Sequence, residues 1–232
     1  MDSSVLGQRD RLEGRYAVEV GFTDRGLDLG DAAPEAVREG GLAAVATVTG
    51  AAPRLMCQVH GRAVHEVRAD EPGAPPEADG LVSRAPRVAL LARAADCVPV
   101  LLADAETGWI GAAHAGRPGV ALGVVPAVVA AMRAGGARAL TAWVGPHVCG
   151  RCYEVPERMR AEVAEVVPET WSTTSWGTPA LDLGAGVIAQ LDAAGCAVRV
   201  VAGCTREDAR WPSCRRDGAA ATRFAGVVWR SS

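Results

Sequence analysis

Residues 87–116 read RVALLARAADCVPVLLADAETGWIGAAHAG, three short apolar runs separated by polar and glycine residues. The runs cover 87–94, 98–103 and 109–114, which is a usual length for a strand and too short for a typical helix. The turn at 104–108 would fold the second and third runs back on each other as an antiparallel hairpin. This stretch therefore predicts a β-rich centre for the fold.

Downstream of this hairpin the pattern alternates between helices and strands. The segment 119–134 follows Pro118 and ends at Gly135, as expected for a helix that starts after a proline and stops at a glycine. We also expect strands at 140–144 and 197–202 and helices at 156–167 and 182–194. Two further segments, 70–80 and 171–180, are expected to be polar loops. The alternation predicts a mixed α+β domain built from packed layers.

The composition indicates one globular domain over residues 1–232. The chain is 49% hydrophobic and 22% charged, which is enough apolar material for a large core. All 24 basic residues are arginine. This excludes enzymes that need a lysine Schiff base or a phosphate-loop lysine, and it leaves arginine to bind any phosphate.

Charge and hydropathy argue against nucleic-acid and membrane partners. The net charge is −3 and the arginines are spread along the chain, unlike the basic stripe of a duplex-binding protein. The longest apolar stretch, Val120–Met132, is interrupted by Pro126 and is too short to span a bilayer. Because the seven cysteines are an odd number and the N-terminus lacks an export signal pattern, we expect reduced thiols and a cytoplasmic protein.

Cys97 and His114 lie at the open end of the expected hairpin. Their position numbers add up to 211, which places them opposite each other with Cβ atoms about 4.5–5.5 Å apart. A thiolate and an imidazole are good zinc ligands, and a third histidine would leave one coordination position for water or substrate. The alternative is packing, because a cysteine near a strand end and a single histidine are usually core residues. Without a metal, the same pair would suit a cysteine hydrolase, with Cys97 as nucleophile and His114 as base.

A second cysteine motif, Cys149-x-x-Cys152, stands further along the chain. On its own this motif is typical of half a zinc site or of a redox pair. Because the chain has no second such pair at a suitable spacing, the pattern favours ordinary packing.

Several motifs, taken in their order along the chain, resemble those of one family. They are Gln58–Gly61 (QVHG), Ala95–Asp104 (ADCVPVLLAD), Ala113–Gly116 (AHAG), Gly145-Pro146, Cys152–Val155 (CYEV), Leu181–Leu183 (LDL), Cys204-Thr205 and Arg215–Gly218 (RRDG). The family is variously called YfiH-like, laccase-domain, polyphenol oxidase or peptidoglycan-editing-factor proteins. The resemblance runs from Gly21 to Trp229.

The resemblance implies a single α+β domain, a layered α/β/β/α sandwich with mixed sheets inside and helices outside. It also implies that His60, Cys97 and His114 bind one zinc ion. The implied activity is that of a purine nucleoside phosphorylase, which cleaves adenosine, inosine and methylthioadenosine with phosphate to the base and ribose 1-phosphate. Some adenosine deaminase activity is implied as well. The expected partners are therefore small molecules, namely purine nucleosides and phosphate.

Arginines in the family-like motifs are the candidates for phosphate binding, because an arginine fork suits bidentate contacts to phosphate. These candidates are Arg25, Arg215 and Arg216. Asp96, next to Cys97, is a candidate for orienting the thiolate, or else a turn residue. The sequence departs from the family at Arg117, where tryptophan is usual, and at Cys214, where tyrosine is usual. Substrate preference can therefore differ from that of other members.

The oxidase names of the family imply a different chemistry. A multicopper oxidase uses about four copper ions and about ten histidines to bind them. This chain has four histidines, which excludes that architecture. A single copper ion at the expected zinc ligands, with weak phenol oxidation, is the alternative that remains. A cell-wall editing factor without catalytic activity is a further alternative, but three ligands around an open position have little structural use.

Overall fold

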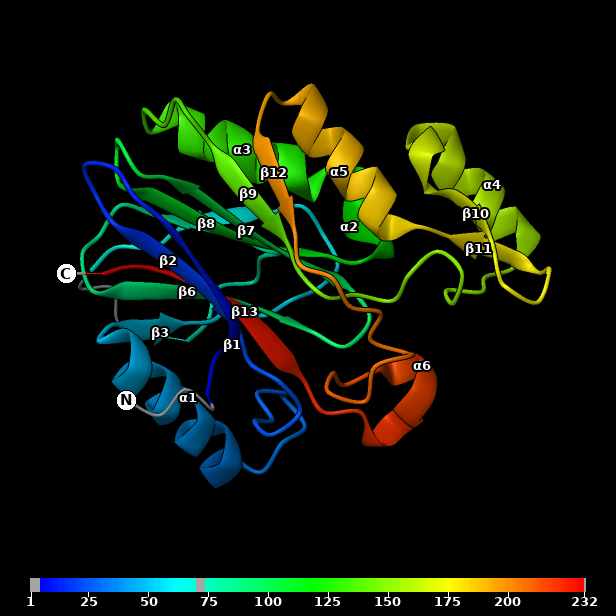
Figure 1. Cartoon of the computed structure of the whole chain (residues 1–232), viewed down its shortest axis with the longest axis horizontal. Helices are drawn as coiled ribbons and strands as arrows, with labels where there is room; N and C mark the ends of the chain where they lie inside the picture. Colours follow the sequence, from blue (N-terminus) through cyan, green and yellow to red (C-terminus); the bar gives the residue numbers. More distant parts are fainter. Residues whose placement is uncertain (1–4, 70–73, 232) are drawn as a thin grey trace.

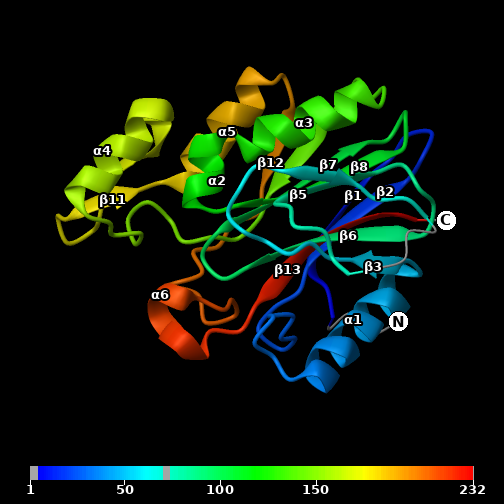
Figure 2. The same ribbon diagram turned by 180° about the vertical axis from the view of Figure 1, so that it is seen from behind.

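The computed structural model describes residues 5–69 and 74–231. Two β-sheets lie face to face, and helices cover the outer face of each sheet (Figures 1 and 2). Both large sheets contain parallel and antiparallel pairs. The predicted fold class, an α+β sandwich of α/β/β/α layers with mixed sheets, is confirmed.

The first sheet has six strands in the order β12-β9-β7-β8-β5-β4. Their bounds are β4 Val64–Glu66, β5 Gly80–Ser83, β7 Val98–Asp104, β8 Trp109–Ala115, β9 Thr141–Val144 and β12 Ala197–Val200. The inner strands pair antiparallel, whereas the outermost pairs, β12 with β9 and β4 with β5, are parallel.

The second sheet has five strands in the order β1-β2-β13-β6-β3. Their bounds are β1 Gly7–Leu12, β2 Val18–Phe22, β3 Ala52–Arg54, β6 Val88–Ala94 and β13 Phe224–Arg230. Strand β13, from the end of the chain, pairs with β2 on one side and β6 on the other. This sheet therefore joins segments from the beginning, the middle and the end of the sequence.

Helices complete the outer layers in the described part of the chain. Their bounds are α1 Glu35–Thr49, α2 Arg117–Leu122, α3 Val124–Ala134, α4 Glu157–Val166, α5 Leu183–Ala193 and α6 Cys214–Asp217. Helices α2, α3 and α5 cover the six-stranded sheet, and α1 covers the other sheet (Figure 1). Helix α4 packs on the small hairpin of β10 (Trp171–Thr173) and β11 (Pro179–Leu181) at one end of the molecule.

Strand β7 shows why the central segment decides the layering. All seven of its residues are buried, because it has a covered face on each side. Val98, Val100 and Leu102 pack into the core beneath the helices, and Leu101 and Ala103 pack into the core between the sheets. The alternation follows from the two-residue period of a strand.

The chain crosses from one sheet to the other between β6 and β7. Only three residues, Ala95–Cys97, connect the two strands. Asp96 adopts a φ of +90°, in the left-handed region that non-glycine residues rarely occupy. The sharp crossover places Cys97 at one end of the space between the sheets.

The hairpin of β7 and β8 forms as predicted, but its register differs by two residues. Asp104 pairs with Trp109, so opposed positions add up to 104 + 109 = 213, and His114 faces Pro99. The turn is shorter than expected because Asp104 stays in the strand, where its carboxylate accepts two backbone N–H groups of the turn. Since side chains alternate with a period of two, this shift leaves Cys97 and His114 on the same face as diagonal neighbours.

Two further expectations are corrected by the structure. The helix expected over 119–134 is two helices, because Gly123 takes a φ of +80° and interrupts the hydrogen-bond ladder. The polar loop expected over 171–180 contains the strands β10 and β11. Their turn is held by a hydrogen bond between the Thr174 and Thr178 hydroxyls.

The loop expected over 70–80 is described in part. Residues 70–73 lie outside the described residues. Residues 74–79 belong to no helix or strand, as predicted, apart from an isolated bridge between Glu77 and Cys57. Gly80 is the first residue of β5.

Candidate metal centre

Three segments far apart in the sequence bring His60, Cys97 and His114 together. His60 lies in the loop between β3 and β4, Cys97 in the crossover, and His114 near the end of β8. Their potential ligand atoms all lie within 4.8 Å of one another. Cys97 Sγ is 3.8 Å from His60 Nε2, and the two imidazole rings meet edge to face with centroids 4.8 Å apart. A thiolate and two imidazoles at this spacing can hold one metal ion.

Asp79 holds both histidines in position. Its fully buried carboxylate accepts a hydrogen bond from His114 Nδ1 at 2.8 Å and from the backbone N–H groups of Val59, His60 and Gly61. The pairing through Nδ1 leaves His114 Nε2 as the candidate ligand atom. A carboxylate behind a metal-binding histidine is the common way to fix its tautomer and orientation.

The same carboxylate stabilises an unusual backbone at His60. This residue has a φ of +61°, and three successive N–H groups converge on Asp79 around it. Burial alone would raise the pKa of Asp79, but the hydrogen bonds from His114 and the backbone outweigh burial and lower that pKa. Asp79 therefore remains an anion and an acceptor for all four donors.

Sequence reasoning missed Asp79, because it stands at the end of a loop rich in proline and acids. The signal lies in the strand pairing. Gly80 pairs with Ala113 across β5 and β8, so Asp79 directly faces His114. Only the register of β5 reveals this.

Without a metal, Cys97 and His114 form a thiolate–imidazolium pair. Burial alone would raise the pKa of the Cys97 thiol, but hydrogen bonds and charge from His114 and His60 lower it from 9.0 to about 6. Burial alone would lower the pKa of His114, but Asp79 and Cys97 raise it from 6.5 to about 9. The sulfur is therefore an anion near neutral pH, as both a metal ligand and a nucleophile require.

Gly116 leaves the space that the site needs. A Cβ atom at this position would overlap His60 Cδ2 and lie 3.2 Å from Cys97 Sγ. No side chain fits there unless His60 moves. The glycine of the AHAG motif is thus explained by close approach of the two ligand side chains.

Asp96 acts on the backbone around Cys97. Its carboxylate accepts hydrogen bonds from the Thr205 hydroxyl and from the backbone N–H of Arg215, both at 2.7 Å. Its carbonyl accepts the N–H of Val148 at 3.1 Å. These contacts tie the crossover to two other loops and to helix α6. That Asp96 orients Cys97 stays a prediction.

A pocket of about 420 Å³ opens onto the three candidate ligands. Its walls include the candidate ligands, residues next to them in the sequence and residues from two further segments. The neighbouring residues are Gln58 and Arg93–Ala95, and the further segments supply Asp28, Gly30–Ala33, Cys214, Gly218, Ala219, Ala221 and Arg223. Arg93 is buried and forms a bidentate pair with Asp31. Arg223 donates through Nη1 to the carbonyls of Ala221 and Thr222. Two guanidinium groups therefore stand beside the site.

The arginines chosen from the sequence do not line this pocket. Arg25 is half-exposed and pairs with Asp217 at 3.2 Å. Arg216 binds both carboxylate oxygens of Asp217, and its terminal nitrogens bind several backbone carbonyls. Arg215 contacts the Tyr153 ring and lines a separate pocket of about 510 Å³. Their predicted role in phosphate binding stays a prediction.

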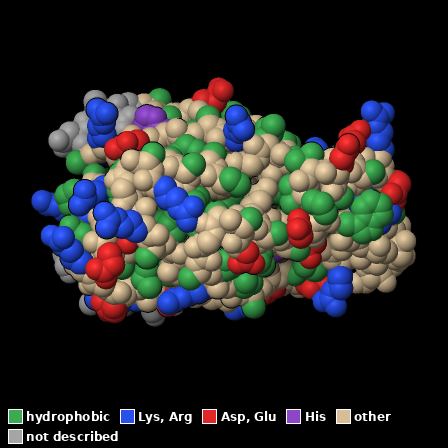
Figure 3. Space-filling model, turned by 90° about the horizontal axis from the view of Figure 1, so that it is seen from above, with side chains coloured by type: hydrophobic (Ala, Val, Ile, Leu, Met, Phe, Trp, Pro, Cys, Tyr) green, Lys and Arg blue, Asp and Glu red, His purple; other side chains and the backbone are tan. Residues whose placement is uncertain are grey.

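The helical face of the molecule has a mixed surface. Seen from above the helices, arginine and acidic side chains are interspersed, with apolar side chains between them (Figure 3).

In the part of the chain that the structure describes, every helix is too short or too polar to cross a membrane.

Comparison with known proteins identifies close relatives. The family model described as multi-copper polyphenol oxidoreductase laccase matches residues 6–231. A purine nucleoside phosphorylase of Streptomyces coelicolor is 46% identical over 97% of this chain and 99% of its own length. One from Streptomyces griseus is 55% identical over 75% of this chain and 72% of its own length.

Solved structures have the same fold. YlmD from Geobacillus stearothermophilus superposes with a TM-score of 0.85 at 25% identity, covering 99% of this chain and 100% of that one. The Neisseria meningitidis protein NMB0706 gives a TM-score of 0.83 at 25% identity, covering 97% and 100%.

Proposed function

We propose, from the premise that this chain belongs to the multi-copper polyphenol oxidoreductase laccase family, that it is a metal-dependent purine nucleoside phosphorylase. Relatives that carry this activity in their names match most of the chain at 46% and 55% identity. The observation that carries the proposal is the convergence of His60, Cys97 and His114 in the lining of a pocket large enough for a nucleoside.

The donor set fits zinc. Two imidazoles and one thiolate are ligands that zinc accepts in catalytic sites, where a fourth position stays open. When bound, the metal would supply a Lewis acid or a template for phosphate or a ribose hydroxyl. Copper would accept similar ligands, and four histidines in the whole chain still exclude a multicopper cluster.

In phosphorolysis the bond from ribose C1′ to the purine nitrogen breaks, a bond from C1′ to a phosphate oxygen forms, and the purine takes up a proton. The protein must hold phosphate, an anion, against the sugar. Arg93 and Arg223 supply positive charge at the pocket wall. The Arg93 guanidinium is already paired with Asp31, so Arg223 is the better candidate for direct phosphate contact. Adenosine and inosine are the substrates to test first.

A cysteine hydrolase is the second candidate, because Cys97 and His114 form a nucleophile–base pair without any metal. The two functions differ in what they need. A phosphorylase needs phosphate and the metal, whereas the hydrolase needs neither and is inactivated by alkylation of Cys97 in the metal-free protein.

The test is release of hypoxanthine from inosine by purified protein, with and without phosphate. We expect release that requires phosphate, that is lost in Cys97→Ala, and that persists in Cys196→Ala, a buried cysteine outside the site. Arg223→Gln should raise the KM for phosphate while leaving the bound metal unchanged. Equal release without phosphate would replace the proposal with hydrolysis, and no turnover of inosine or adenosine by zinc-loaded protein would refute it.

A further inference from the structure

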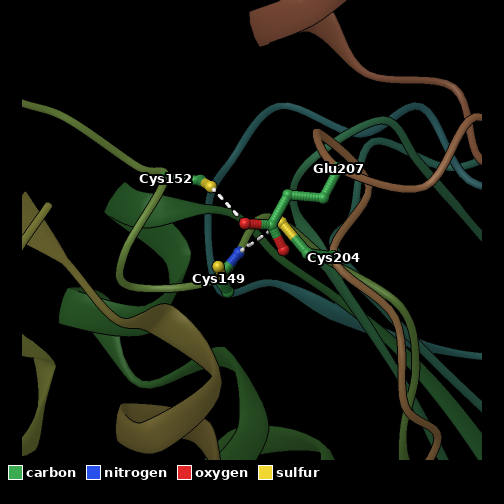
Figure 4. A group of neighbouring side chains, drawn as sticks. All are labelled: Cys149, Cys152, Cys204 and Glu207. Carbon is green, nitrogen blue, oxygen red and sulfur yellow. Dashed lines mark hydrogen bonds between the residues drawn. The ribbon is translucent and has the colours of Figure 1, made fainter. Parts of the chain in front are cut away.

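We propose that Cys149, Cys152, Cys204 and Glu207 form a second zinc site, a closed structural one, separate from the candidate catalytic centre. The four potential ligand atoms lie within 4.8 Å of one another. Figure 4 shows their side chains converging from two loops that face each other. Fifty-five positions separate Cys149 from Cys204 and also Cys152 from Glu207.

The two loops have the same local structure. In the first, the carbonyl of Cys149 accepts the N–H groups three and four positions later, at 2.9 and 3.0 Å. In the second, the carbonyl of Cys204 does the same at 3.1 and 2.9 Å. Each loop is thus a tight turn that presents two ligands, at its first and fourth positions. Two such turns facing each other are the arrangement of a zinc knuckle, in which each turn supplies half of the ligands.

Hydrogen bonds hold the two turns against each other. The backbone N–H of Cys149 donates to Cys204 Sγ at 3.4 Å, and Cys152 Sγ donates to Glu207 Oε1 at 3.4 Å (Figure 4). A β-bridge joins Cys204 to His147, two residues before Cys149. Contacts across the pair of turns therefore place the four groups in the metal-free chain.

The donor set selects zinc. Three thiolates favour soft or borderline metals and disfavour magnesium and calcium, and the carboxylate oxygen disfavours copper(I). Tetrahedral zinc with Zn–S bonds of about 2.3 Å separates its sulfur atoms by about 3.8 Å. Ligand atoms that all lie within 4.8 Å of one another need only a small contraction to reach this spacing. With four protein ligands, this site has no position for substrate, unlike the centre at His60, Cys97 and His114.

Charge and burial also fit a metal. Three thiolates and one carboxylate carry two more negative charges than zinc neutralises. Each turn contains an arginine between its ligands, Arg151 in the first and Arg206 in the second. Cys152 is buried, Cys149 and Cys204 are half-buried, and Glu207 is exposed. The cluster thus opens to solvent at Glu207, which provides an entry path for the ion.

The cluster is connected to the candidate catalytic centre through Asp96. Val148, next to the first turn, donates its N–H to the Asp96 carbonyl. Thr205, in the second turn, donates its hydroxyl to the Asp96 carboxylate. Since Asp96 precedes Cys97, a metal that fixes both turns also fixes the backbone of that ligand. We therefore assign the second zinc a role in preorganising the crossover.

Elemental analysis of the full chain, purified without chelators, tests the site directly. We expect two zinc ions per wild-type chain, one in Cys204→Ser, and one in the double variant His60→Ala/Cys97→Ala. Cys196→Ala, which changes a buried cysteine outside both clusters, should retain two. Glu207→Gln should lose zinc to a competing chelator more than about tenfold faster than wild type, because even residues that only orient a ligand have effects of this size.

A spectroscopic measurement covers the case in which Cys204→Ser fails to fold. X-ray absorption at the zinc edge of His60→Ala/Cys97→Ala, which leaves the second site intact, should show a shell dominated by sulfur at about 2.3 Å. Three results would overturn the proposal. They are absence of zinc from this double variant, a shell of nitrogen and oxygen only, and a native mass lower by two hydrogens from a disulfide among the three cysteines.

Discussion

Replacing Asp79 with asparagine removes one charge and one acceptor from the centre of the candidate metal site, with no change in volume. In the wild type, one carboxylate oxygen accepts from His60 N–H and His114 Nδ1, and the other accepts from the N–H groups of Val59 and Gly61. An asparagine keeps one acceptor oxygen and turns an NH₂ group toward two N–H donors. Two hydrogen bonds are lost whichever way the amide is oriented.

The magnitude follows from these contacts. A hydrogen bond to a charged group contributes about 1.5–3 kcal/mol, so the loss of two sets an upper range of about 3–6 kcal/mol. Relaxation of the exposed His60 loop will recover part of this, and we expect a loss of about 3 kcal/mol in the free energy of unfolding. Zinc affinity at the site should fall about 10–100-fold, because His114 loses the partner that fixes its tautomer.

Two assays measure these effects. Urea unfolding followed by tryptophan fluorescence gives the stability, and competition with a chromophoric chelator gives the zinc affinity. Glu162→Gln is the matched control, because its carboxylate pairs with the exposed Arg158 on the surface of α4, and we expect a change below about 1 kcal/mol and no change in zinc affinity. If Asp79→Asn kept both the stability and the zinc affinity of the wild type, our account of Asp79 would be wrong.

Three further predictions test the rest of the site and the core. Gly116→Ala should expel His60 from the site, because the new Cβ would overlap its ring, and elemental analysis should then show one zinc ion fewer per chain while far-ultraviolet circular dichroism stays unchanged. In the metal-free protein, a Cys97 pKa of about 6 means that the rate of alkylation by iodoacetamide should rise with pH, with a midpoint at about pH 6. Mass spectrometry of the alkylated peptide measures this midpoint. A midpoint near 9 would contradict the thiolate–imidazolium pair. Ionisation of Cys97 also stabilises the folded metal-free protein: this contribution is complete above pH 9 and is lost as the pH falls through about 6. Protonation of His114 contributes stability that is complete below pH 6.5 and is lost as the pH rises through about 9. Leu101→Ala, in the core between the sheets, should lower the free energy of unfolding by about 2–5 kcal/mol with little effect on zinc content. A loss below about 1 kcal/mol would show that the packing of the two sheets does not depend on this side chain.

Local sequence patterns account for the centre of the fold. The runs that became β6, β7 and β8 were visible because each is a short, continuous apolar segment between turn residues. Helix α4 was visible because acidic residues and arginines recur along it at helical spacing. Helix α5 was predicted to begin at Asp182, and this residue caps the helix. Strands β1, β3 and β4 were not predicted, because they lie at a sheet edge and are only partly buried. Helix α1 and strands β2, β5 and β13 were not predicted either, although these three strands are almost wholly buried.

The expected hairpin indicated Cys97 and His114, and the resemblance to the family indicated His60 as the third candidate ligand. The hairpin argument survived a register error of two residues, because the face of a strand depends only on whether a position number is odd or even.

Tertiary structure alone decided which distant groups complete the two clusters. Asp79 faces His114 because β5 pairs with β8, and Cys204 and Glu207 reach Cys149 and Cys152 because a β-bridge brings their loops together. Neither pairing leaves a pattern in the residues themselves. The amino-acid sequence determines short segments through interactions over a few positions, whereas convergence across many positions depends on how complete sheets and layers pack.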